Sequence, residues 1–92
     1  MPTHKFKLFI MGQTPRSQHA IHTLRRICDT TMPGEYELTI IDVLEQPQIA
    51  EEHNILATPT LIKEWPLPTR RVLGDLSDKE KLLLALDIYP ER

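Results

Sequence analysis

Hydrophobic and polar residues repeat along the chain with two different periods, and the changes of period mark the expected elements. Apolar residues at every second position predict strands, whereas apolar residues three and four positions apart predict helices. The sequence then predicts strands and helices in the order β-α-β-α-β-β-α. We expect strands at residues 6–11, 36–43, 60–64 and 69–74, and helices at residues 15–31, 47–53 and 78–86.

The first expected helix has a recognisable start, an apolar side and a recognisable end. Thr14 can cap its N-terminus, and Pro15 suits the first helical position, where a missing N–H loses no partner. Pro33 and Gly34 end the helix. A helix of this length between two strands forms a crossover, so we expect those strands to be parallel. The apolar side of the helix consists of Ser17, Ala20, Ile21, Leu24, Ile27, Cys28 and Thr31.

The last expected helix carries more apolar residues than one buried side needs. Ser77 and Glu80 fit a capping box at its start. A helix on a small domain keeps one side polar, so this segment either packs deeply or offers an apolar side to another protein. The apolar residues are Leu82, Leu83, Leu84, Ala85, Leu86, Ile88 and Tyr89.

Thr58 and Pro59 stand directly before an apolar strand, where a proline is tolerated as the first residue. Because an X–Pro bond reaches the cis form for about 0.5–1 kcal/mol, this pair is the candidate for a structural cis-proline. That arrangement is typical of thioredoxin-like domains. Redox members of the fold carry Cys-x-x-Cys after the first strand, and here that position reads Thr14-Pro15-Arg16-Ser17. We therefore expect one α/β, thioredoxin-like domain over residues 1–92, with a mixed four-stranded sheet, helices on both faces and a binding role.

Composition and charge exclude several classes of function. A formal net charge of −2 gives no basic footprint for nucleic acid. No apolar run approaches the ~20 residues of a membrane span, and the polar N-terminus lacks the apolar region of a signal peptide. We therefore expect a cytoplasmic protein. Cys28 is the only cysteine and lies on an apolar helix side, where a thiol is inert.

Candidate catalytic and metal chemistry is sparse. His19 and His22 supply two ligands, fewer than the three or four of a zinc site, so we expect solvated histidines and no metal. The glycines lie far apart and form no phosphate-binding loop. We expect no cofactor and no enzymatic activity. The N-terminus of the first helix attracts anions, which leaves glutathione-type binding conceivable.

Four blocks of sequence carry a resemblance to a known family, and together they span nearly the whole chain. They are residues 12–17, 41–48, 55–61 and 67–77, which read GQTPRS, IDVLEQPQ, ILATPTL and LPTRRVLGDLS. In this order the blocks resemble the KaiB clock proteins. The resemblance implies a non-enzymatic regulator that binds the first ATPase ring of a KaiC-like hexameric kinase and modulates its phosphorylation cycle.

The resemblance also implies two folds, a thioredoxin-like monomer that binds KaiC and a tetramer with a rearranged C-terminal half. A homo-oligomer, dimer or tetramer, is therefore an alternative state. Ala85 stands where the family usually has glycine and favours helix by about 0.8–1 kcal/mol, so we expect the thioredoxin-like form. The alternative function is a stress-response adaptor or a kinase-associated sensor module, with a histidine kinase as its partner.

Two surfaces are candidates for partner binding. The second strand is expected at an edge of the sheet, where unpaired backbone groups invite a partner strand. The resemblance assigns KaiA-type partners to that edge, but Thr39 replaces the family's usual lysine there and argues against a KaiA-like partner. We expect a KaiC-like ring on the other surface. One of its two arginines should lean towards the helices, because neighbours on a strand alternate. This surface combines Leu67, Arg70, Arg71, Leu84 and Ile88.

Overall fold

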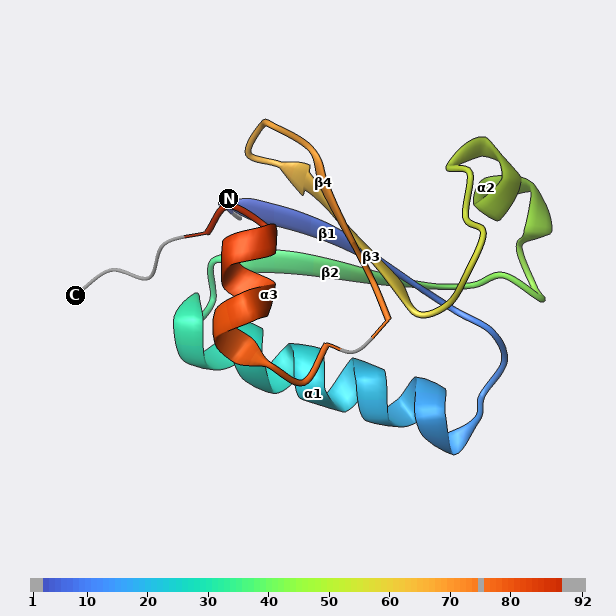
Figure 1. The fold of residues 1–92 in the computed structure, drawn as a ribbon, viewed down its shortest axis with the longest axis horizontal. Coiled ribbons are helices and arrows are strands. Elements are labelled where there is room, and N and C mark those ends of the chain that lie inside the picture. Colours follow the sequence, from blue (N-terminus) through green and yellow to red (C-terminus); the bar gives the residue numbers. More distant parts are fainter. Residues whose placement is uncertain (1–2, 75, 89–92) are drawn as a thin grey trace.

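The computed structural model describes residues 3–74 and 76–88, and its elements follow the order expected from the sequence (Figure 1). The segment 79–85 is helical, so the C-terminal half has the thioredoxin-like arrangement. The elements are β1 (His4–Ile10), α1 (Pro15–Thr31), β2 (Tyr36–Asp42), α2 (Pro47–Glu52), β3 (Thr60–Trp65), β4 (Arg70–Leu73) and α3 (Lys79–Ala85).

The strands form one mixed sheet in the order β2-β1-β3-β4. β1 and β2 are parallel because the crossover through α1 returns the chain in the same direction. β3 is antiparallel to both β1 and β4. The register places Leu8 between Ile40 and Leu61, and Leu61 opposite Val72. One apolar row therefore crosses all four strands.

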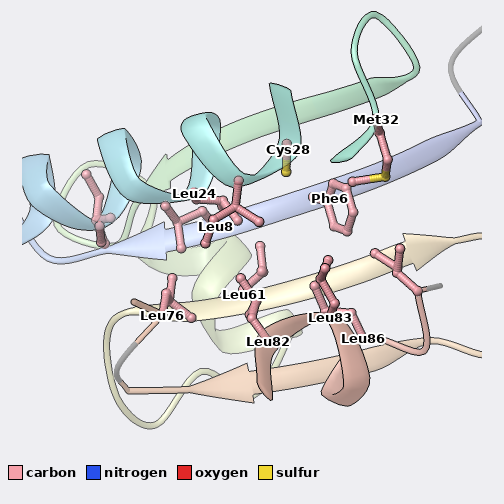
Figure 2. Close-up of a cluster of buried hydrophobic side chains, with 14 residues drawn as sticks. Phe6, Leu8, Leu24, Cys28, Met32, Leu61, Leu76, Leu82, Leu83 and Leu86 are labelled. Carbon is pink, nitrogen blue, oxygen red and sulfur yellow. The ribbon is translucent and has the colours of Figure 1, made fainter. Parts of the chain in front are cut away.

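The main core lies between this apolar row and the helices α1 and α3. Figure 2 shows Leu24 and Cys28 of α1 and Leu82 and Leu83 of α3 gathered around the side chains of the strands. Fully burying one such leucine contributes about 1.5–3 kcal/mol. The buried members are Phe6, Leu8, Ile10, Ala20, Leu24, Ile27, Cys28, Met32, Leu61, Leu76, Leu82, Leu83, Leu86 and Ile88.

A smaller core lies on the opposite face of the sheet, beside α2. Phe9, Ile41 and Ile62 are buried there, and Ile49 of α2 and Ile55 pack against them. The sheet thus has helices on both faces, as the sequence predicts. A helix of six residues is too short to be stable alone, so this contact holds α2 in place.

The ends of the helices agree with the sequence at α1 but not at α3. Thr14 caps α1 and accepts a hydrogen bond from the Ser17 N–H. At α3 the expected capping box is wrong by one residue. Asp78, not Ser77, is the N-cap, and its side chain accepts from the Lys81 N–H. A carboxylate at this position also stabilises the positive end of the helix.

Candidate functional site

The functional site that the fold suggests lies where β1 and β2 end and β3 begins. The peptide bond of the candidate pair Thr58–Pro59 lies there and is cis. The loop after β1 is held by Asp42, whose Oδ1 accepts hydrogen bonds from the Gly12 N–H at 3.0 Å and the Leu44 N–H at 2.9 Å. Gly12 has a φ of 74°, a conformation that a residue with a Cβ rarely adopts. These contacts fix the entry to α1.

Thr14 and Ser17 occupy the two positions of the thiols in redox members of the fold. The Thr14 hydroxyl donates to Ser17 Oγ at 3.0 Å and accepts from the Ser17 N–H at 3.1 Å. Ser17 is buried. These hydrogen bonds cap the helix. Hydroxyl groups carry no sulfur, so this pair cannot form a disulfide. Cys28 lies elsewhere, in the main core, where burial raises the pKa of its thiol to about 12.

Two hollows flank the start of α1. One, of about 350 Å³, is lined by residues of the β1 loop, α1 and the Thr58–Pro59 pair. The other, of about 210 Å³, lies between α1 and the segment after β4. Arg16 and Pro59 line both, so the hollows are adjacent. Their described lining combines apolar side chains with the cationic Arg16 and the ionisable His19, an arrangement suited to binding.

The structure separates the two arginines that the sequence had placed on one partner surface. Arg70 pairs with Lys63 on the face of the sheet that carries α3. Arg71 pairs with Ile62 on the α2 face, and its guanidinium donates to the backbone oxygens of His53 and Asn54. Grouping Arg71 with the last helix is therefore wrong, because β4 directs its side chain to the opposite face.

The three apolar residues expected on the same surface also differ in exposure. Leu84 and Leu67 are each 67% exposed, on α3 and in the hairpin between β3 and β4. Ile88 is only 5% exposed and belongs to the main core. α3 thus packs deeply on one side and still presents Leu84 to water. Tyr89, which was expected beside them, lies outside the described residues.

Lys63 is a feature that the sequence reading missed. It is 1% exposed, on the face of β3 that meets the helices. Burial lowers the pKa of its ammonium group, the Asp87 carboxylate opposes this shift and the Arg70 guanidinium adds to it. The alternation of β3 contained the signal, because Lys63 is two residues from the buried Leu61 and so shares its face.

The histidines do not assemble into a metal site. His19 Nε2 lies 3.5 Å from Thr23 Oγ1, and His53 Nδ1 lies 2.9 Å from the Ile49 oxygen. Within residues 3–74 and 76–88 there is no cluster of three side chains able to hold a metal ion. Across the same residues, none of the helices has the length and apolar character needed to span a bilayer.

Comparison with known proteins places this sequence in one family. A family model described as the KaiB domain matches residues 7–88. A circadian clock oscillator protein KaiB from Prochlorococcus marinus is 55% identical over 86 residues, which cover 94% of this chain and 82% of that protein. The protein of the same name from Synechococcus elongatus is 54% identical over 86 residues, with 94% and 84% covered.

Solved structures agree about the fold. The N-terminal domain of SasA from Synechococcus elongatus superposes with a TM-score of 0.77 at 27% identity, over 95% of this chain and 86% of that domain. Mitochondrial thioredoxin 3 from Saccharomyces cerevisiae gives a TM-score of 0.71 at 16% identity over 95% and 79%, a likeness of fold alone. Because the family model spans most of the chain and the relatives are more than half identical to it, this chain belongs to the KaiB family of circadian clock proteins.

Proposed function

We propose that this chain is a non-enzymatic regulator that binds a KaiC-like hexameric ATPase and modulates its phosphorylation cycle. The observation that carries the proposal is the likeness, over nearly the whole chain, to circadian clock oscillator proteins. The fold is consistent with a non-enzymatic role, because Thr14 and Ser17 are hydrogen-bonded to each other at the positions where redox members of the fold have thiols. Such a scaffold retains its surfaces for binding and lacks the dithiol for exchange.

The proposed contact with the ring is the hairpin-end surface, which we define as Leu67, Arg70 and Leu84. Arg70 begins β4 directly after the hairpin that holds Leu67, on the face of the sheet where α3 packs. Both leucines are two-thirds exposed. An apolar residue that becomes buried in a complex slows dissociation, whereas a charge at the rim speeds association. The two leucines supply the apolar element, and Arg70 supplies the charge.

The direct test mixes the protein with a KaiC-like hexamer from the same host and reads the complex by native mass spectrometry. A phosphate-affinity gel then follows phosphorylation of the ring over time. We expect a defined complex and an altered phosphorylation time course. A ring that neither binds the protein nor changes its phosphorylation would contradict the proposed function.

Two matched variants locate the contact. Leu84→Asp should weaken the complex strongly, whereas Leu56→Asp, at a leucine that is 94% exposed, should leave it unchanged. Both leucines are exposed, so both variants should fold, which circular dichroism checks. If Leu56→Asp lost the complex and Leu84→Asp kept it, the ring would bind elsewhere while the function itself stood.

A second candidate is an adaptor for a histidine kinase in stress signalling. The observation that favours it is the structural likeness to the N-terminal domain of SasA. A tagged protein used as bait in the native host distinguishes the two, because either a KaiC-like hexamer or a histidine kinase should be enriched. Enrichment of the kinase without the hexamer would favour the adaptor.

A further inference from the structure

Four large apolar side chains are exposed at one end of the sheet, away from the hairpin. Met11 is 53% exposed, Leu44 66%, Leu56 94% and Leu73 63%. Met11 follows β1, Leu44 follows β2, Leu56 precedes β3 and Leu73 ends β4. The directions of the strands bring the ends of β1, β2 and β4 and the start of β3 to the same end of the sheet (Figure 1). Exposed apolar side chains that lie together at one end of a domain can mark an interaction site.

The two hollows beside Arg16 open at this same end. Ile10, Met11 and Pro59 line the larger, and Ala20, Pro59 and Leu76 line the smaller. Together with the four exposed side chains, the hollows form what we call the strand-end surface. Arg16 is exposed and lines both hollows.

Positive charge lines the part of the strand-end surface that the structure describes. The described side chains that line the hollows include Arg16 and His19 but no carboxylate. The first turn of α1 contains no acidic residue, so the positive end of the helix is not neutralised locally. The Asp42 carboxylate, at the end of β2, accepts hydrogen bonds from two backbone N–H groups. An acidic group on a partner can therefore meet the Arg16 guanidinium and the positive end of α1 at this surface.

The backbone at Thr58 adds a second means of recognition. Thr58 is partly exposed and lines the larger hollow. Within residues 3–74 and 76–88 its peptide groups form no backbone–backbone hydrogen bond. An extended chain can pair with such groups. Side chains two residues apart on an extended chain are about 6.6–6.8 Å apart and point the same way, a spacing suited to adjacent hollows.

We propose that the strand-end surface is a docking groove for an extended segment of a partner protein, in which a carboxylate binds Arg16 and flanking apolar side chains enter the two hollows. This groove lies at the opposite end of the sheet from the hairpin-end surface, so its occupant does not compete with the contact proposed for the ring. The groove recognises acidic-apolar sequences and disfavours basic ones.

The test is a titration of the 15N-labelled protein with a capped octapeptide that has a central glutamate flanked by two valines on each side. We expect amide shifts at Gly12, Thr14, Arg16, Thr58 and Leu73, and weaker binding as salt increases. A peptide with glutamine in place of glutamate should bind about tenfold more weakly, and one with lysine should not bind.

A charge reversal on the protein completes the test. Arg16→Glu should abolish binding of the glutamate peptide and allow binding of the lysine peptide. An acidic residue suits the first turn of a helix, so this variant should fold. Arg26→Glu, an exposed arginine later on α1, is the matched control and should bind like the parent protein.

Three results would overturn the proposal. They are absence of binding by the glutamate peptide, equal binding of the glutamate and glutamine peptides, and retention of glutamate-peptide binding by Arg16→Glu. Amide shifts at the same residues that depend on protein concentration and not on the peptide would show that a second copy of this chain binds the surface. That result would also reject the proposed occupant.

Discussion

Cys28 and Tyr36 show how single side chains of this chain acquire properties that their residue type does not give. Burial raises the pKa of the Cys28 thiol to about 12, and the Asp29 carboxylate adds to this shift. The Tyr36 hydroxyl donates to Asp29 Oδ1 at 2.5 Å, and this hydrogen bond raises the pKa of the phenol to about 12. Both groups therefore keep their protons in the folded state at a pH where an unfolded chain releases them.

This difference predicts a loss of stability in alkali. The free energy of unfolding should keep its full value below about pH 9 and should fall as the pH rises towards 12, because the unfolded chain then binds fewer protons than the folded chain. Each group can contribute a slope of up to about 1.4 kcal/mol per pH unit. Urea denaturation from about pH 8 to about pH 10.5 measures the slope.

Two variants assign that slope to its causes. Cys28→Ala and Tyr36→Phe should each flatten the alkaline decline, whatever constant change in stability they introduce. If both variants declined in parallel with the parent protein, neither group would be the source.

At the scale of elements, α2 and α3 are short helices that depend on specific contacts at their ends. Asp78 supplies the contact at the start of α3 through its hydrogen bond to the Lys81 N–H. Arg71 supplies the contact at the end of α2 through hydrogen bonds to the oxygens of His53 and Asn54. Helices of six or seven residues are unstable alone, so these contacts should be measurable.

Asp78→Ala should lower the free energy of unfolding by about 0.5–2 kcal/mol, because it leaves an N–H of α3 without its cap. Asp78→Ser should recover most of this loss, since a serine hydroxyl accepts the same hydrogen bond. Thermal or urea denaturation gives the comparison. Equal losses for alanine and serine would show that the cap is not the stabilising contact.

Arg71→Ala should increase amide hydrogen exchange in residues 53–58 and lower stability by about 0.5–1.5 kcal/mol. The residue bridges β4 to the loop that follows α2, so its loss should act locally. Arg70→Ala is the control, because Arg70 lies on the opposite face of the sheet. Faster exchange in the α2 loop of the Arg70 variant would contradict this assignment.

At the scale of the whole molecule, two surfaces lie at opposite ends of one sheet. The hairpin-end surface combines Leu84, Leu67 and the cationic Arg70, whereas the strand-end surface surrounds Arg16. The sheet and α1 connect the two ends (Figure 1). Such an arrangement allows one small domain to contact two partners at once.

If the hairpin-end surface binds a KaiC-like ring, charge and apolar burial should affect different rate constants. Arg70→Ala should slow association at low salt and have little effect at high salt, because screening removes its contribution. Leu84→Asp should speed dissociation at every salt concentration. Surface plasmon resonance with immobilised ring separates the rates. A salt-independent effect of Arg70→Ala on association would contradict the proposed rim role.

The sequence by itself determined the order of the elements, the start of α1 at Thr14 and the family. These features depend on local signals, namely the period of the apolar residues, the helix-capping residues and four blocks of sequence. Asn54, two residues after the end of α2, has a φ of 54°, a conformation that asparagine tolerates. Boundaries of strands differed from expectation by one or two residues, as is usual where pairing decides the ends.

Only the tertiary structure decided which side chains reach a partner and which are buried. The alternation of side chains along a strand predicted that Arg70 and Arg71 lie on opposite faces of the sheet. The pairing of β4 with β3 decided which of the two lies on the face that carries α3. Leu84 is exposed because α3 packs through one side only, whereas Ile88, which follows α3, is buried in the main core. The strand-end surface joins residues distant in sequence. Exposure and proximity arise from register and packing between elements, which a local pattern of residues does not encode.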